Sequence, residues 1–161
     1  MTLSTDELAT WASLATLLER LPTALDAQLQ RDSGLTHFEY GVLVALDTAP
    51  DRTLRLSVLA GYAACTLSRL SRAMTRLEKS GLVQRAVDPT DGRFTLGTLT
   101  AHGHDVVQAA TPGHRELVRR LVFDVLTDEE ARHLGQLSGR LVEATGPGPA
   151  WSPPSPPAPP A

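Results

Sequence analysis

The stretch that decides the fold is LVQRAVDPTDGRFTLGTLTAHG, residues 82–103. Two short runs of β-forming residues, 82–87 and 94–99, flank the turn-forming sequence DPTDGR. Two such runs separated by a short turn that contains Asp and Gly predict a β-hairpin. Arg93 lies at its tip, so the predicted turn presents a cation to solvent.

An amphipathic helix is predicted directly before this hairpin, over residues 66–80. At about 100° per residue, its large apolar side chains fall on one side, at Leu67, Leu70, Met74 and Leu77. Its arginines fall on the opposite side, at Arg69, Arg72 and Arg76. Thr66 is the expected N-cap and Gly81 the expected C′ glycine. A helix followed at once by such a hairpin is typical of a winged helix-turn-helix, whose helix enters the major groove of DNA.

The charge of the chain is unevenly distributed. The net charge is −3, but residues 52–93 carry eight basic residues against three acids. Residues 1–51 carry two arginines against eight acids, and residues 94–161 carry five arginines against seven acids. This pattern indicates a basic surface at the predicted helix and hairpin, with acidic flanks that face away from phosphate.

The composition excludes several classes of protein. With 161 residues, of which 42% are hydrophobic, the chain is long enough for one domain with its own core. No apolar run approaches the roughly 18 residues of a membrane span, and no secretory signal is visible. The single cysteine, Cys65, fits a cytoplasmic protein. Because no nucleophile, P-loop or metal-ligand motif is found, neither a cofactor nor an enzymatic activity is expected.

A long first helix is predicted over residues 4–31, where leucines recur every three or four positions. Ser4 and Glu7 have capping-box spacing, and Pro22 is expected to bend or interrupt the helix. The apolar stripe is long for a domain that has its own core to build. Part of it is therefore expected to pack against a partner chain.

Shorter elements are predicted on both sides of residues 66–99. Thr36 opens a helix that runs to about residue 47, with Phe38 on its inward side, and a short helix over 56–62 is ended by Gly61. Thr100 opens a helix to about residue 110, where Thr111-Pro112 predicts a break and a restart. Thr127 opens the last helix, and the proline-rich residues 146–161 are predicted to be a disordered tail.

The sequence around the hairpin resembles the MarR family of bacterial transcriptional regulators. The wing signature of that family, an Asp-x-Arg followed by Leu-Thr and Gly, matches Asp91, Arg93, Leu99, Thr100 and Gly103. SRAMTRLEKSGLVQR, residues 71–85, is similar to the end of the family's recognition helix, and GLTHFEYGVL, residues 34–43, resembles an actinobacterial subgroup. The resemblance covers about residues 5–145. The chain departs from the family at Gly61 and at Arg55, where a Ser or Thr cap is usual.

The resemblance implies a mainly α (α+β) fold in a domain over residues 1–145. It places a winged helix-turn-helix lobe at about 36–99 and dimerisation helices at about 4–31 and 112–144. A homodimer of this kind binds double-stranded DNA at a pseudo-palindromic operator. Family members are often repressors that a small aromatic or phenolic effector releases, and this behaviour is expected here.

The candidate DNA-binding residues are Thr66, Ser68, Arg69, Arg72, Arg76, Asp91 and Arg93. Arg69 and Arg72 are the best candidates for base readout, because a guanidinium can bond guanine O6 and N7 together. Thr66 and Ser68 are placed to reach bases or phosphate, and Arg76 to contact phosphate or solvent. Arg93 either enters the minor groove or pairs with Asp91. The competing interpretation of the three helix arginines is an ordinary solvated face.

Trp11, His37, Phe38 and Tyr40 lie on elements that line the effector pocket in the family, although ordinary core or interface roles are the competing interpretation. Cys65 precedes the predicted recognition helix and suggests a redox-responsive regulator, but sensors in the family carry their cysteine in the first helix. His102 and His104 point to different sides of a helix, so no metal site is assigned. The remaining alternative is a winged-helix module that binds a protein partner.

Overall fold

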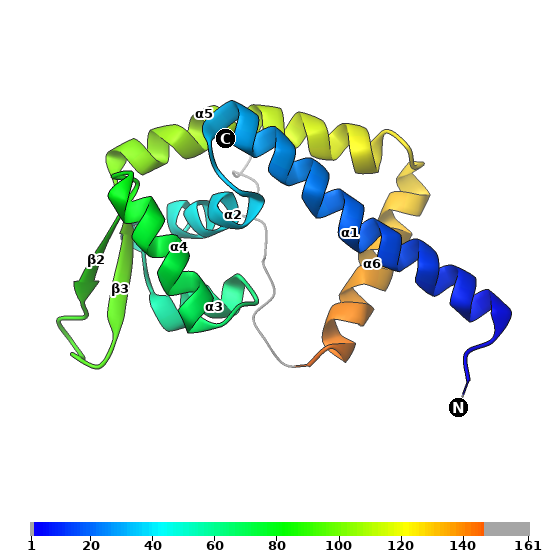
Figure 1. Ribbon diagram of the computed structural model, residues 1–161, viewed down its shortest axis with the longest axis horizontal. Coiled ribbons are helices and arrows are strands. Elements are labelled where there is room, and N and C mark those ends of the chain that lie inside the picture. Colours follow the sequence, from blue (N-terminus) through cyan, green and yellow to red (C-terminus); the bar gives the residue numbers. More distant parts are fainter. Residues whose placement is uncertain (1, 147–161) are drawn as a thin grey trace, which may run out of the picture.

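The computed structural model describes residues 2–146 (Figure 1). The elements in chain order are α1 (Thr5–Ser33), α2 (His37–Asp47), the 3₁₀ turn η1 (Pro50–Arg52), β1 (Thr53–Arg55), α3 (Leu56–Tyr62), α4 (Leu67–Lys79), β2 (Val83–Val87), β3 (Thr95–Leu99), α5 (Ala101–Val118), the π-helical turn η2 (Arg119–Phe123) and α6 (Asp128–Ala144). Helices dominate, as the predicted fold class requires. The tail predicted over 146–161 lies outside the described residues, apart from Gly146.

A small lobe and an extended set of long helices make up the molecule (Figure 1). The lobe contains α2, α3, α4 and an antiparallel sheet with the strand order β1-β3-β2. The C-terminal part of α1 packs along α5 and on α2. The N-terminal part of α1 and the whole of α6 extend away from the lobe (Figure 1). No helix within residues 2–146 is long and apolar enough to cross a membrane.

The core of the lobe is formed by side chains from every helix that surrounds it. The largest fully buried side chains include Leu29 of α1, Leu43 and Leu46 of α2, Leu59 of α3, and Leu70 and Met74 of α4. Each buried leucine of this kind stabilises the fold by about 1.5–3 kcal/mol relative to an exposed one. α4 is therefore fixed in the lobe by one face, and its opposite face is left to solvent.

The helix starts predicted from the sequence are confirmed. All three capping boxes form, at Ser4 with Glu7, at Thr36 with Glu39 and at Thr127 with Glu130. Thr66 accepts a hydrogen bond from the backbone N–H of Arg69 at 3.2 Å, and Thr100 accepts one from Gly103 at 2.9 Å. Gly81 follows α4 in the left-handed region, with φ of 72°, as a C′ glycine does.

The predicted interruptions at the two prolines do not occur. α1 runs through Pro22 and α5 runs through Pro112 without a break. Both prolines are exposed, so water can bond the carbonyl that each leaves without an N–H partner. The two helices also pack closely at Gly113 of α5. A side chain at this position would have its Cβ only 3.2 Å from Nε2 of Gln28 in α1. The departure from α-helical geometry comes later, at η2.

The short helix α3 has the predicted bounds, 56–62, but Gly61 lies within it, and Ala64 makes the turn into α4 with φ of 45°. One expectation for α4 is corrected. Leu67 was expected on the buried side of α4, yet its side chain is 55% exposed. As the first residue of the helix, Leu67 lies beyond the end of the core. The small Ala73, 1% exposed, joins the buried face with Leu70, Met74 and Leu77.

Candidate nucleic-acid interface

The exposed face of α4 carries polar and basic side chains. Ser68, Ser71 and Arg72 are exposed, and Thr66 caps the helix immediately before them. Within residues 2–146, Arg72 takes part in no ion pair, side-chain hydrogen bond or ring contact. Its five N–H donors therefore face water and are available to a ligand.

The other two arginines of α4 are held by α2. The guanidinium carbon of Arg69 lies 4.5 Å from the centre of the Phe38 ring, a cation–π distance. The Nε of Arg76 donates to Oε1 of Glu39 at 2.8 Å. Both contacts involve the first turn of α2, so this turn fixes one edge of the basic face.

Glu39 joins the capping of α2 to the position of α4. Its side chain is only 6% exposed. One carboxylate oxygen accepts bonds from the backbone N–H and the hydroxyl of Thr36, at 3.0 and 2.9 Å, while the other accepts from Arg76. Burial alone raises the pKa of Glu39, but the bonds from Thr36 and Arg76 outweigh it and hold the pKa below its ordinary value. In the sequence, Glu39 has capping-box spacing with Thr36, and no local pattern indicates its bond to Arg76.

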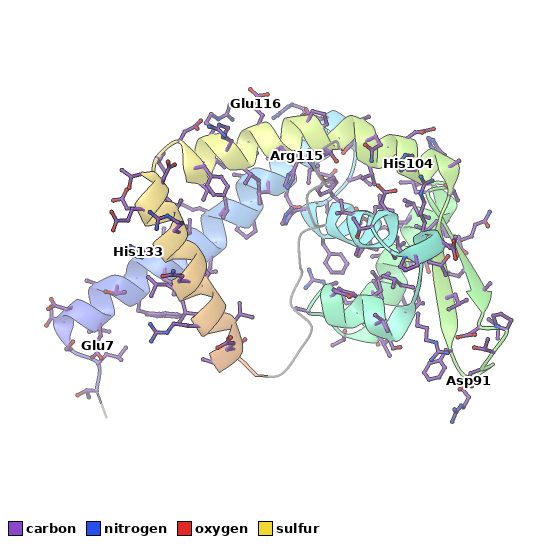
Figure 2. The ribbon with its side chains drawn as sticks, turned by 180° about the vertical axis from the view of Figure 1, so that it is seen from behind. Glu7, Asp91, His104, Arg115, Glu116 and His133 are labelled. Carbon is purple, nitrogen blue, oxygen red and sulfur yellow. The ribbon has the colours of Figure 1, made fainter. Side chains whose placement is uncertain are left out.

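The wing is the hairpin of β2 and β3, paired from Val83 with Leu99 to Val87 with Thr95. Asp91 lies at its tip (Figure 2). Arg93 donates from Nε and Nη2 to the two oxygens of Asp91, at 2.9 and 2.6 Å, and these bonds lower the pKa of the Asp91 carboxyl. Of the two alternatives for Arg93, the structure shows pairing with Asp91, and the arginine side chain remains 83% exposed.

The loop at the tip end of the wing is anchored to the start of α3 by Arg55. As the N-cap residue of α3 it makes no side-chain cap. Instead, its Nε donates to Oδ2 of Asp88 at 2.8 Å, and its guanidinium carbon lies 4.3 Å from the centre of the Phe94 ring. The sequence flagged Arg55 only as an unusual cap. That missing cap was the one available signal that the side chain is engaged elsewhere.

Asp88 completes this anchor. It is 5% exposed and accepts bonds from the hydroxyl and the backbone N–H of Thr90, at 2.6 and 2.8 Å, as well as from Arg55. The Thr90 bonds, followed by those of Arg55, lower the pKa of Asp88 to about 2. These contacts tie the loop of the wing to the start of α3.

Comparison with known proteins agrees with this geometry. Residues 33–93, which contain α2 to the tip of the wing, match the family model described as "MarR family". The chain is 32% identical to the transcriptional regulator HosA of Escherichia coli O111:H- over 109 residues, which are 68% of this chain and 70% of the relative. The chain belongs to the MarR family.

Two solved structures extend the likeness beyond the lobe. The MarR-family regulator Sco3205 of Streptomyces coelicolor, solved in complex with DNA, is 42% identical with a TM-score of 0.88, over 91% of this chain and 95% of that one. AbsC, another MarR-family regulator of the same organism, is 30% identical with a TM-score of 0.85, over 90% and 97% of the two chains. Like these relatives, this MarR-family chain is a transcriptional regulator with a winged helix.

The candidate effector residues of this regulator are only partly brought together. The His37 and Tyr40 rings lie 5.5 and 4.7 Å from the ring of His114, and the Tyr40 hydroxyl lies 3.0 Å from Oγ1 of Thr111. Burial lowers the pKa of both histidines. Phe38 turns to Arg69 instead. Trp11 is 56% exposed on the outer part of α1, so it does not join this cluster.

Two polar atoms near the α1–α5 contact have no hydrogen-bond partner among the described residues. They are Nδ1 of His114 and Oε1 of Gln28. Gln28 also lines a groove of about 400 Å³ between α1 and α5. A buried polar atom without a partner is costly, so such atoms mark a place where a ligand group or water adds a favourable bond.

The cysteine and histidines singled out in the sequence lie elsewhere. Cys65 is half-buried against the core of the lobe. Nδ1 of His104 lies 2.6 Å from Oδ1 of Asp47, while His102 is exposed. Within residues 2–146, no three His, Cys, Asp or Glu side chains are arranged to hold a metal ion.

Proposed function

We propose that this regulator is a homodimer that binds a pseudo-palindromic DNA operator, with α4 in the major groove and the wing against the backbone or the minor groove. The observation that carries the proposal is Arg72 on the exposed face of α4, which has no partner within residues 2–146 and lies beside a wing that Arg55 and Asp88 anchor. The complex of the relative Sco3205 with DNA supports it.

The contacts within the lobe suggest separate roles for the basic side chains. Arg69 and Arg72 are the candidates for base readout, and the free guanidinium of Arg72 makes it the stronger. Arg76, held by Glu39 at the edge of the face, is assigned to a phosphate oxygen, with Thr66 and Ser68 near the helix start. An exposed ion pair contributes little to the stability of the fold. Arg93 can therefore leave Asp91 and contact DNA at a small cost in free energy.

The long helices support a second copy of the chain as partner. α6, which is described throughout, has no buried residue. Its Leu134, Leu137 and Leu141 are exposed, as are Leu8, Trp11 and Leu18 of α1. Exposed apolar side chains of this number on two long helices indicate an interface. A two-fold dimer places its recognition helices about 34–36 Å apart, one turn of DNA, which accounts for a pseudo-palindromic operator.

The cluster of His37, Tyr40 and His114 is the proposed effector site, for a small aromatic or phenolic molecule. Its aromatic rings and the unpartnered Nδ1 of His114 suit such a ligand. The first turn of α2, which carries His37, also holds Arg69 and Arg76. A ligand that shifts this turn would shift α4, and with it the affinity for the operator. We infer a repressor that the effector releases.

Fluorescence anisotropy of the full chain tests DNA binding. The probe is the DNA upstream of the protein's own gene, and a scrambled duplex of the same composition is the control. Selective binding that weakens steeply between two salt concentrations is expected, because each phosphate contact releases counterions. Equal binding to both duplexes would contradict operator recognition.

A further inference from the structure

Leu67 is exposed on a helix that buries its other apolar side chains. Leu70, Ala73, Met74 and Leu77 of α4 are 0–2% exposed, whereas Leu67 is 55% exposed. Burying a leucine stabilises a fold by about 1.5–3 kcal/mol, and Leu67 forgoes most of that gain. Its place in α4 therefore calls for a role outside the core of the lobe.

The position of Leu67 is that of a base-reading residue. It is the first residue of α4, between the N-cap Thr66 and the exposed Ser68. In helix-turn-helix proteins the N-terminal residues of the recognition helix are the ones that reach base edges. An apolar side chain there meets the major-groove edge of the bases.

The two edges of α4 differ in chemistry. Arg69 and Arg76 occupy the edge next to α2. At about 100° per residue, Leu67 shares the other edge with Ser71 and Thr75. This edge faces the wing, since Nη2 of Arg85 in β2 donates to Oγ1 of Thr75 at 3.2 Å. The wing-side edge thus begins with an exposed leucine and carries small hydroxyl residues behind it.

We propose that Leu67 recognises the C5-methyl group of a thymine in the major groove. The inference rests on the proposed DNA-binding function and deepens it by adding a specificity-determining residue. Thymine is the only standard base that presents a methyl group in the major groove, and apolar side chains contact it there. Leu67 would then favour thymine over cytosine at one position of each half-site. The polar residues of α4 do not recognise the methyl group by which these two bases differ there.

The test removes the methyl group and changes nothing else on the base. Duplexes that bind the full-length wild-type protein are first enriched from a random pool. In the enriched sequence, each thymine of one half-site is then replaced singly by deoxyuridine, and affinities are measured by anisotropy. One replacement is expected to lower the affinity of the wild-type protein for the duplex about fourfold, which corresponds to the burial of one methyl group. Leu67→Ala should bind the thymine and uracil duplexes equally.

Two variants control the experiment. Leu67→Met keeps an apolar side chain and should retain part of the preference for the methylated base. Val87→Ala truncates an exposed aliphatic side chain at the end of β2 and should leave the preference unchanged, because the minor groove and the backbone present no methyl group. Thermal unfolding of each variant shows whether the lobe remains folded.

The outcomes separate the inference from the proposed function. If the wild-type protein enriches no sequence, the DNA-binding proposal fails and the inference fails with it. If a sequence is enriched but no single uracil replacement weakens binding, only the inference is overturned. It is also overturned if Leu67→Ala keeps the sensitivity to uracil, since a different residue then reads the methyl group.

Discussion

Arg72 differs from the other two arginines of α4 because nothing within residues 2–146 holds its guanidinium. A side chain that donates two bonds to one guanine supplies about 1–3 kcal/mol of discrimination against other bases. Arg72→Ala should therefore lose about this much affinity for the operator and relax the preference at one base pair. Competition with operators substituted at single positions measures both effects.

Lys79 provides the matched control for that substitution. It is an exposed cation at the other end of α4, so Lys79→Ala removes the same charge from the same helix. The Lys79→Ala variant should lose affinity for the specific and the random duplex by the same factor, because a phosphate contact carries no sequence information. Equal losses on both duplexes for Arg72→Ala as well would refute the assignment of base readout to Arg72.

Asp88 makes the stability of the wing dependent on acid. Its pKa in the folded protein is about 2, against an ordinary value of 3.8, because Thr90 and Arg55 stabilise the carboxylate. The stabilisation is fully present above about pH 4 and is lost as the pH falls through the folded pKa. Asp88→Asn lacks this contribution. The difference in the free energy of unfolding between wild type and variant should shrink as the pH falls from about 4 to about 2.

Chemical denaturation at a series of pH values gives this difference directly. Five other carboxyls also have lowered pKa values, so the acid response of the wild type alone is shared among them; they are Glu7, Glu39, Glu78, Asp91 and Glu130. Subtraction of the variant isolates Asp88. A difference that stays constant with pH would contradict the anchoring role of its charge.

At the scale of the element, the first turn of α2 connects the proposed effector cluster to α4 through Glu39. Glu39→Gln retains a side chain that can complete the capping box but loses the charge that pairs with Arg76. Glu39→Ala loses both. We expect the alanine variant to be destabilised by about 1–3 kcal/mol, because a buried network is left with unpaired groups, and the glutamine variant to be destabilised less.

Urea unfolding followed by circular dichroism ranks the two Glu39 variants. The same proteins also test the connection between α2 and α4, since Glu39→Gln frees Arg76 while α2 stays capped. The Glu39→Gln variant should therefore differ from the wild type in its affinity for the operator while it keeps most of its stability. If the two variants unfold at the same urea concentration, the cap contributes nothing and the charge that pairs with Arg76 is the whole stabilising role of Glu39.

Elements with local signals could be predicted from the sequence, and contacts between elements could not. Capping boxes are formed by residues three positions apart, so Ser4, Thr36 and Thr127 could each be identified as a helix start. The pairs that hold the basic face and the wing join residues 37 and 33 positions apart, and no local pattern announces them. Helical periodicity predicts the buried face of α4 but not the point at which the core ends. The prediction that Leu67 is buried is therefore wrong.

At the scale of the whole molecule, the exposed apolar side chains of α1 and α6 predict that two chains associate and cover them. Leu137 and Leu141 of α6 are each about half exposed, at 53% and 52%. Replacing both with Asp would place charges in the proposed dimer interface, where an unpaired buried charge is strongly unfavourable. Light scattering after gel filtration should then report the mass of one chain for the variant and of two for the wild type.

The same variant shows how the dimer contributes to DNA binding. The lobe buries its own core without α6, so its thermal unfolding should remain cooperative. Affinity for a full operator should fall steeply, because the second recognition helix no longer binds at the high local concentration that the dimer provides. Gln136→Asp, on the opposite face of α6, adds the same kind of charge and should leave both mass and affinity unchanged. A double variant that stays dimeric would place the interface on other surfaces than α6.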